Sequence, residues 1–574
     1  MKRHYSIVFF TMIIVFMVVS ACDIESPFVP RSFTPSITWT PTFTPFQPPA
    51  STPQPDMSEP VQPTPTSSST PTEAVLSIWV DPQLPAALRE AVIIPLEFVS
   101  ASEAEGAALR LEVGREEPLG HWVYALVAPF PTLTQDVSSE NLRSYWSGGS
   151  SVTFEGGPLL MDDSTHAVFF KLWGEPAAGA TKVLPGSALL DAAWGSRTSW
   201  AIVPFEALEP RWKVLGVDGL SPLRKGFDPS AYALSVPFSV AGDPTLAGLV
   251  RALYGSEADT PLIPASNRDP EKLTTLAMTG VTALVRSTAY TMEQRGIKYP
   301  GRDVRDWLRG ADITHISNEV PFAKDCPYPN PVQPGLQFCS DPRYIGLLED
   351  IGTDIVELTG DHFRDWGADA MYYTLDLYDE RGWPYYGGGA NLKEGRRAVI
   401  MEHNGNRLAF IGCNGKGGWY ATASANHPGA VSCDFDWMGS EIARLRQEGY
   451  LPIVTFQHFE YYSYLAQPKQ IRDFQKVADA GAVIVSGSQA HQPQAIEFYN
   501  DALIHYGLGN LFFDQYAINL ATRQAFIDRH VFYDGRHIGT ELLPILFMDY
   551  ARARPMTKEE RNKLFRSVFS ASGW

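Results

Sequence analysis

The stretch "PIVTFQHFEYY" (residues 452–462) decides the fold class of the larger part of the chain. Its apolar start is typical of a buried strand, and His458 and Glu460 follow where the apolar run ends. The same arrangement occurs in three other stretches: "ADITHISNEVPF" (311–322), "DIVELTGDHFRDWG" (354–367) and "AVIVSGSQAHQPQ" (482–494). Strands that deliver polar groups at their carboxyl ends predict an α/β sheet with a site on that rim.

The polar residues after these four runs are of the kinds that bind divalent metals. They are Asn318, Glu319, Asp361, His362, His458, Glu460 and His491. Carboxylates and imidazoles suit Mn, Fe, Mg or Zn, which assist hydrolysis. Taken singly, each residue also fits a structural role: His458 fits a buried histidine paired with a tyrosine hydroxyl, and Asp365 fits a helix cap. Their recurrence at four strand ends favours a common site.

The order of these motifs resembles the capsule-synthesis family CapA, proteins of poly-gamma-glutamate biosynthesis with a calcineurin-like metallophosphatase fold. The resemblance extends over nearly half of the chain and rests on six stretches: "MTGVTALVR" (278–286), "SNEVPF" (317–322), "TGDHFRDWG" (359–367), "QHFEYY" (457–462), "GSQAHQPQ" (487–494) and "HYGLGNLFFD" (505–514). It implies a metallophosphatase-like α/β sandwich and a role in the synthesis or attachment of a capsule or another exopolymer.

The resemblance also implies roles for individual residues. The implied metal ligands are Glu319, Asp361, His458 and His491, supported by Asn318, Glu460, Gln489 and Asn510. His362 would protonate a leaving oxygen, steered by Asp365. The implied cofactor is a divalent metal, with Mn, Fe, Mg and Zn all left open.

Three positions depart from the motifs of this family. Val281 stands where the family has Asp, Asp361 where it has Asn, and Gln489 where it has His. The missing carboxylate and imidazole remove a ligand from each side of a two-metal centre, so a single metal is the better expectation. Two functions stay open: metal-assisted hydrolysis of a phosphoester-type bond, and non-catalytic binding of an envelope polymer or ligand.

We expect residues 75–260 to form a separate α/β domain that precedes the domain at 270–574 in the sequence. In "HWVYALVAPFPTLTQDVSSENLRSYWSG" (121–148) we predict a strand over Val123–Ala128 and a helix over Ser138–Trp146. Such stretches loosely resemble periplasmic solute-binding proteins, which hold a ligand between two lobes at helix N-termini. Ser138 fits such a contact, but a helix cap is the simpler interpretation.

The first residues predict export from the cytoplasm. The segment "MKRHYSIVFFTMIIVFMVVSAC" (1–22) has the basic start, apolar run and small residues of a signal peptide. Its end resembles a bacterial lipobox, which implies that Cys22 is lipidated; an uncleaved membrane anchor is the alternative. Residues 23–74 are rich in Pro, Thr and Ser and predict an extended linker.

The remaining cysteines and the charge agree with this compartment. The pairs Cys326–Cys339 and Cys413–Cys433 are close in sequence and fit an oxidising envelope, although the sequence alone leaves the pairing open. The net charge of −18 argues against a nucleic-acid partner. We therefore expect a membrane-anchored lipoprotein outside the cytoplasm whose partner is an envelope polymer or glycan.

Two other stretches are interpreted from local signals. "GCNGKGGWY" (412–420) lacks the spacing of a phosphate-binding loop and predicts only a turn after the strand "RLAFIGC" (407–413). The tail from about residue 526 predicts two strands joined by a turn at Asp534–Gly535, followed by a closing helix from Thr557.

Overall fold

The structure is a computed structural model that describes residues 76–149, 157–255, 261–418 and 420–574. The predicted signal peptide with Cys22, and the predicted linker, lie outside these residues. No helix within the described ranges is both long and apolar enough to cross a membrane.

The first ten strands form one mixed sheet. Strand β10 (Ser235–Gly242) lies antiparallel between β3 (Leu109–Val113) and β4 (Gly120–Pro129). The other strands are β1 (Ser77–Val80), β2 (Val99–Ser100), β5 (Asp136–Val137), β6 (Leu159–Met161), β7 (Thr181–Val183), β8 (Ala201–Pro204) and β9 (Trp212–Val217). The predicted strand at 123–128 is the buried middle of β4, whose apolar side chains are buried on both faces of the sheet.

Five α-helices accompany this sheet in the described residues: α1 (Ala86–Ala91), α2 (Ser139–Trp146), α3 (Asp163–Trp173), α4 (Leu189–Ser196) and α5 (Pro244–Tyr254). Helix α2 begins one residue after the predicted start, because Ser138 is its N-cap and accepts a hydrogen bond from the Asn141 N–H at 3.1 Å. The Ser139 N–H donates to Asp218 at 2.9 Å. Both serines therefore have internal partners at this helix start.

The second part of the chain holds two main sheets. The first contains nine strands: β11 (Leu273–Thr279), β12 (Val281–Thr282), β13 (Ile313–Asn318), β14 (Ile355–Glu357), β15 (Tyr385–Tyr386), β24 (Asn510–Phe512), β25 (Gln524–Tyr533), β26 (Arg536–Met548) and β27 (Arg552–Pro555). The second contains β17 (Val399–His403), β18 (Asn406–Asn414), β20 (Leu451–Gln457), β21 (Ile484–Gly487), β22 (Ile496–Tyr499) and β23 (Ala502–His505). A short antiparallel pair is formed by β16 (Gly388–Gly389) and β19 (Gly429–Ala430).

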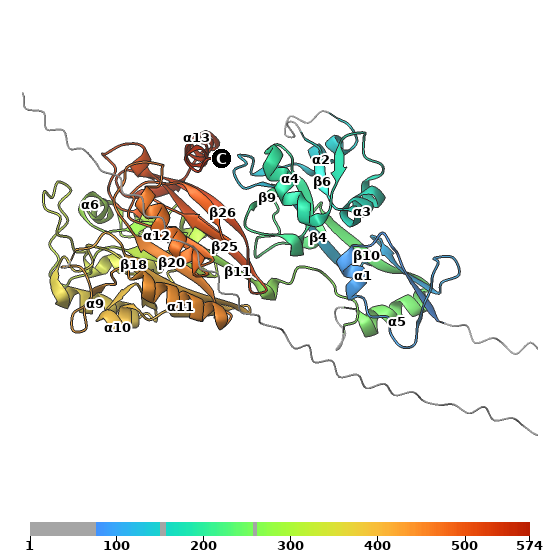
Figure 1. The fold of residues 1–574 in the computed structure, drawn as a ribbon, viewed down its shortest axis with the longest axis horizontal. Coiled ribbons are helices and arrows are strands. Elements are labelled where there is room, and N and C mark those ends of the chain that lie inside the picture. The colour runs from blue at the N-terminus through green and yellow to red at the C-terminus, as the bar shows by residue number, and fades with distance from the viewer. Residues whose placement is uncertain (1–75, 150–156, 256–260, 419) are drawn as a thin grey trace, which may run out of the picture. The chain divides into compact units, whose positions relative to one another are not determined.

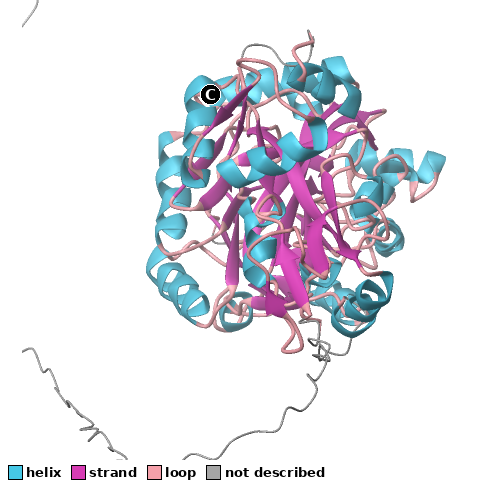
Figure 2. Cartoon of the chain, turned by 90° about the vertical axis from the view of Figure 1, so that its right-hand side faces the viewer, coloured by secondary structure: helices cyan, strands magenta, loops and turns pink. Residues whose placement is uncertain are grey.

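The two sheets pack face to face with helices on their outer sides. In β18, Leu408 and Phe410 join the core between the sheets, whereas Ala409 and Ile411 face the helices α11 and α12. The helices of this part are α6 (Arg286–Arg295), α7 (Arg305–Arg309), α8 (Ile345–Asp350), α9 (Gly367–Asp379), α10 (Leu392–Gly395), α11 (Phe435–Gln447), α12 (Pro468–Asp479) and α13 (Lys558–Ala571). Helices α6 to α9 cover the other sheet, which completes an α/β/β/α sandwich (Figures 1 and 2).

The α/β class predicted from the strand ends is thus confirmed. The tail also follows its local signals: Asp534 and Gly535 both have positive φ angles, 50° and 73°, and join β25 to β26 as a two-residue hairpin turn. Thr557 caps α13 together with Glu560. Disulfides join Cys326 to Cys339 and Cys413 to Cys433.

Candidate metal centre

Parallel strands of both sheets bring the predicted residues to one rim. Glu319 directly follows β13, and His458 directly follows β20. Strand β14 ends earlier than the sequence suggested, at Glu357, whose carboxylate accepts a hydrogen bond from the Thr359 hydroxyl. The chain then passes Gly360, where a Cβ atom would lie 2.8 Å from the Glu319 carbonyl oxygen. This close approach places Asp361 beside Glu319.

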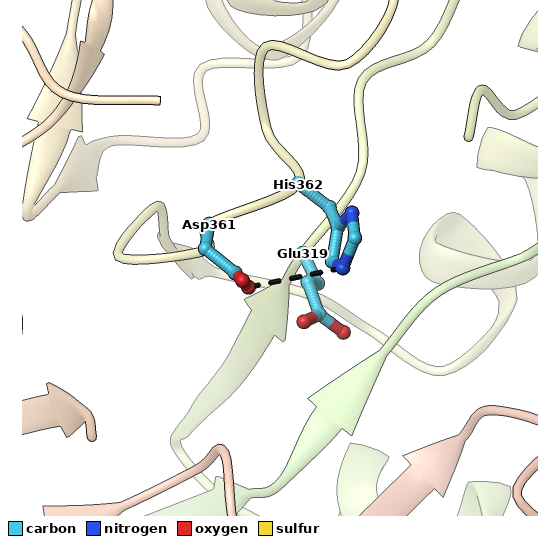
Figure 3. A group of neighbouring side chains, drawn as sticks. All are labelled: Glu319, Asp361 and His362. Atoms are coloured by element: carbon cyan, nitrogen blue, oxygen red, sulfur yellow. Dashed lines mark ion pairs between the residues drawn. The ribbon is translucent and has the colours of Figure 1, made fainter. Parts of the chain in front are cut away.

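Glu319, Asp361 and His362 form one compact group of metal-ligating types. One ligand atom of each lies within 4.8 Å of the others. In Figure 3 the side chains of Asp361 and His362 point toward each other beside Glu319, with 4.0 Å between His362 Nε2 and Asp361 Oδ1. Both carboxyl groups are buried, whereas the imidazole is partly exposed. Two acids and an imidazole at this spacing suit a divalent cation.

The hydrogen bonds of the two acids leave one oxygen of each for a ligand. Glu319 Oε1 accepts from the Gln457 amide at 3.0 Å, and Asp361 Oδ2 contacts the Lys416 ammonium at 2.7 Å. Glu319 Oε2 and Asp361 Oδ1 are buried and have no hydrogen-bond partner in the described structure. Buried carboxylate oxygens without a donor are unfavourable, so these orphaned atoms fit a bound metal ion.

The electrostatics of the group agree with that fit. Burial, followed by the charge of Asp361, raises the pKa of Glu319 to about 8 against the opposing effects of His362 and Lys416. A carboxyl that is hard to ionise alone is stabilised as an anion by a nearby cation. The residues present therefore fit a single divalent metal.

His362 is oriented by a carboxylate on the next turn of the chain. Its Nδ1 lies 2.6 Å from Asp365 Oδ2, and Asp365 also accepts a hydrogen bond from the Phe338 N–H at 3.0 Å. Burial opposes protonation of the ring, but the bond to Asp365 and the charges of Glu319 and Asp361 outweigh it and raise the pKa of His362 to about 9. The imidazole therefore carries its second proton on Nε2, which faces Asp361, at neutral pH.

The other two predicted histidine ligands lie outside this group. His458 Nε2 pairs with Asp473 Oδ2 at 2.9 Å, leaving a buried Nδ1 without a hydrogen-bond partner in the described structure. His491 Nδ1 bonds Asn510 Oδ1 at 2.8 Å, and its Nε2 is 3.5 Å from Glu460. Burial lowers the pKa of both histidines, so both are neutral at pH 7. Their metal-binding roles stay predictions.

The predicted supporting residues serve as hydrogen-bond partners around the rim. Asn318 donates to the Val320 carbonyl and the Tyr378 hydroxyl, at 2.7 and 2.8 Å. Gln489 accepts a hydrogen bond from the Gln457 side-chain amide, which also donates to Glu319. Val281 is fully buried in β12 and contributes no ligand.

Sequence reasoning missed three residues of the rim: Lys416, Gln457 and Asp473. Lys416 stands in the glycine-rich stretch for which only a turn is predicted, although a lysine between glycines after a buried strand is a usable signal. Gln457 is a polar residue at the end of an apolar run, one position before His458. Asp473 lies on helix α12, and nothing in the local sequence links it to His458.

The fold and the rim together define an α/β-sandwich protein with a candidate metal centre. Residues 275–515 match the family described as Bacterial capsule synthesis protein PGA_cap. The chain is 24% identical over 333 residues to the Capsule biosynthesis protein CapA of Bacillus anthracis, covering 57% of this chain and 80% of that protein. It is 22% identical over 266 residues to the PGA biosynthesis protein CapA of Bacillus subtilis (strain 168), covering 46% and 68%.

Two solved structures each resemble part of the chain. A 5′-nucleotidase precursor from Thermus thermophilus has a TM-score of 0.30 and 11% identity, covering 52% of this chain and 58% of that one. An ABC-type phosphate transport receptor from Vibrio cholerae has a TM-score of 0.24 and 12% identity, covering 30% and 91%. At these low scores nothing about activity follows from either similarity.

Proposed function

We propose that the protein acts outside the cytoplasm in the synthesis or attachment of a capsule or exopolymer of the poly-gamma-glutamate or polysaccharide type. The family assignment supports the process, and the names of the two Bacillus relatives support the polymer class. The two disulfides favour an oxidising compartment. The predicted lipid anchor at Cys22 is part of this proposal and would tether the folded part to a membrane.

The proposed chemistry is metal-assisted hydrolysis or transfer at a phosphoester or related bond. The observation that carries it is the juxtaposition of two orphaned carboxylate oxygens, on Glu319 and Asp361, with the imidazole of His362. Glu319 and Asp361 would hold the metal. When bound, a divalent cation supplies Lewis-acid stabilisation of charge on the reacting group.

The residues around the metal would manage the proton. His362 presents Nε2 toward the acidic pair and would give a proton from it to the leaving oxygen. Asp365 fixes the ring through Nδ1 and stabilises its positive charge. Burial of both carboxyl groups keeps water from competing for their charge.

A second function, non-catalytic binding of an envelope polymer, is favoured by one specific contact. Lys416 occupies one oxygen of Asp361 and already neutralises part of the acidic pair. Because Lys416 already balances part of the negative charge, the rim also has the features of a site that binds a polar ligand.

Elemental analysis separates the two functions. The purified protein and an Asp361→Asn variant are loaded with Mn²⁺ or Zn²⁺, desalted and measured for bound metal. Near-stoichiometric metal in the parent and its loss in the variant support the hydrolytic function. If neither protein retains metal, the binding function is the one to pursue.

A further inference from the structure

We propose that Lys416 is a tethered cation that competes with a divalent metal ion for Asp361 and so weakens metal binding at the rim. This inference rests on the proposed metal site and adds a residue that controls its occupancy. The Lys416 ammonium lies 2.7 Å from Asp361 Oδ2 and 4.0 Å from Glu460 Oε2. It therefore sits among the same carboxylates that would attract the metal.

The loop that carries Lys416 is held by hydrogen bonds to the site itself. This loop follows β18, whose last residue, Asn414, donates to Gln457 Oε1 at 3.0 Å and accepts from the Gly417 N–H at 2.8 Å. Gln457 in turn donates to Glu319. The loop that carries Lys416 is thus joined to Glu319 through the buried side-chain amide of Gln457.

The base of this loop is also closely packed. Cys413, at the end of β18, is bonded to Cys433. At Gly415 a Cβ atom would lie 2.9 Å from His458 Cδ2, so only glycine lets the loop approach the rim this closely. The Lys416 side chain itself remains 29% exposed, whereas that of Asp361 is only 3% exposed. The ammonium is therefore able to withdraw toward solvent while the carboxylate stays in place.

The competition follows from charge. Two cations that share one buried carboxylate repel each other, and the repulsion is strong because both acids are shielded from water. An incoming metal ion must displace the ammonium or bind beside it, and either way its affinity falls. Lysine suits this role because its ammonium is a point charge on a flexible stem.

The test is calorimetric titration of the full protein with MnCl₂. We compare the parent with Lys416→Gln and with Lys416→Arg, which keeps the charge. Lys563→Gln is the matched control, because Lys563 is exposed on α13 and its loss changes the net charge equally. Lys416→Gln should bind Mn²⁺ at least about tenfold more tightly than the parent. Lys416→Arg and Lys563→Gln should bind like the parent.

The outcomes separate this inference from the proposed metal site. Tight binding by Lys416→Gln with weak or no binding by the parent supports the competition. Equal affinities in the parent and Lys416→Gln overturn it and leave the metal site standing. Absence of binding in every protein overturns the metal site and the competition together. Circular dichroism verifies folding, and Lys416→Met replaces the Gln variant if that variant is unfolded.

Discussion

Two groups of histidines in the same domain show how position changes the chemistry of one residue type. At the rim, His362 and Asp365 approach to 2.6 Å; inside the domain, His505 and Asp528 approach to the same 2.6 Å. The His362 side chain is 16% exposed, whereas that of His505 is 1% exposed. The contacts are alike, but only the rim pair is open to a substrate and faces further carboxylates.

The interior group extends beyond that pair. His530 Nδ1 bonds the Thr540 hydroxyl at 2.8 Å and is also fully enclosed. Burial, and then the neighbouring histidines His537, His505 and His315, lower the pKa of His530 well below its usual value. The same side chain is thus held as a cation at the rim and as a neutral ring inside. The surrounding charges, not the imidazole contact alone, decide which histidine is suited to proton transfer.

Replacing the rim histidine His362 should have the largest effect. His362→Gln should lower hydrolysis of a chromogenic phosphodiester by about 10²–10⁴-fold, because general acid catalysis contributes that much. Steady-state kinetics of the metal-loaded protein measure it, and bound metal is checked by elemental analysis. His505→Gln, if it folds, should keep the parent rate per folded molecule. An unchanged rate in His362→Gln with metal retained would show that this histidine is not the acid.

Removing the carboxylate of the interior pair should have the next largest effect. Asp528→Ala leaves a buried nitrogen of His505 without its hydrogen-bond partner and should lower the free energy of unfolding by about 1–3 kcal/mol. Urea unfolding followed by circular dichroism measures the loss. Asp365→Ala is the matched control and should cost less, because His362 is partly exposed to water. A larger loss of unfolding free energy for Asp365→Ala than for Asp528→Ala would contradict the expectation that the interior pair contributes more to stability than the rim pair.

The difference between the two regions also explains what the sequence predicts and what it does not. Elements set by local signals are predictable: the Asp534–Gly535 turn, the Ser138 cap of α2 and the Thr557 cap of α13 each need only neighbouring residues. The rim acids were also found, because each follows an apolar strand.

Contacts between distant segments are not predictable in this way. Lys416 and Asp361 are brought together by strands of different sheets, and Asp473 reaches His458 from a helix. The interior pair of His505 with Asp528 depends on how one sheet packs on the other. A single sequence carries no record of such pairings, since charge, burial and distance there are set only after the sandwich has closed.

The pH dependence of stability should differ between the rim and the interior histidines by a smaller amount. Because the folded pKa of His530 lies below its unfolded value of about 6.5, the unfolded state binds more protons, and stability falls as the pH drops below about 6.5. His362 has the opposite sign: its folded pKa of about 9 contributes stability that is present below pH 6.5 and lost as the pH rises through 9. His530→Gln should therefore reduce the fall of stability between pH 6.5 and 5, by up to about 1.4 kcal/mol per pH unit. His362→Gln should leave that fall unchanged or steepen it. Thermal unfolding midpoints across this range measure both, and equal slopes in His530→Gln and the parent would mean that the interior ring is not held neutral by the fold.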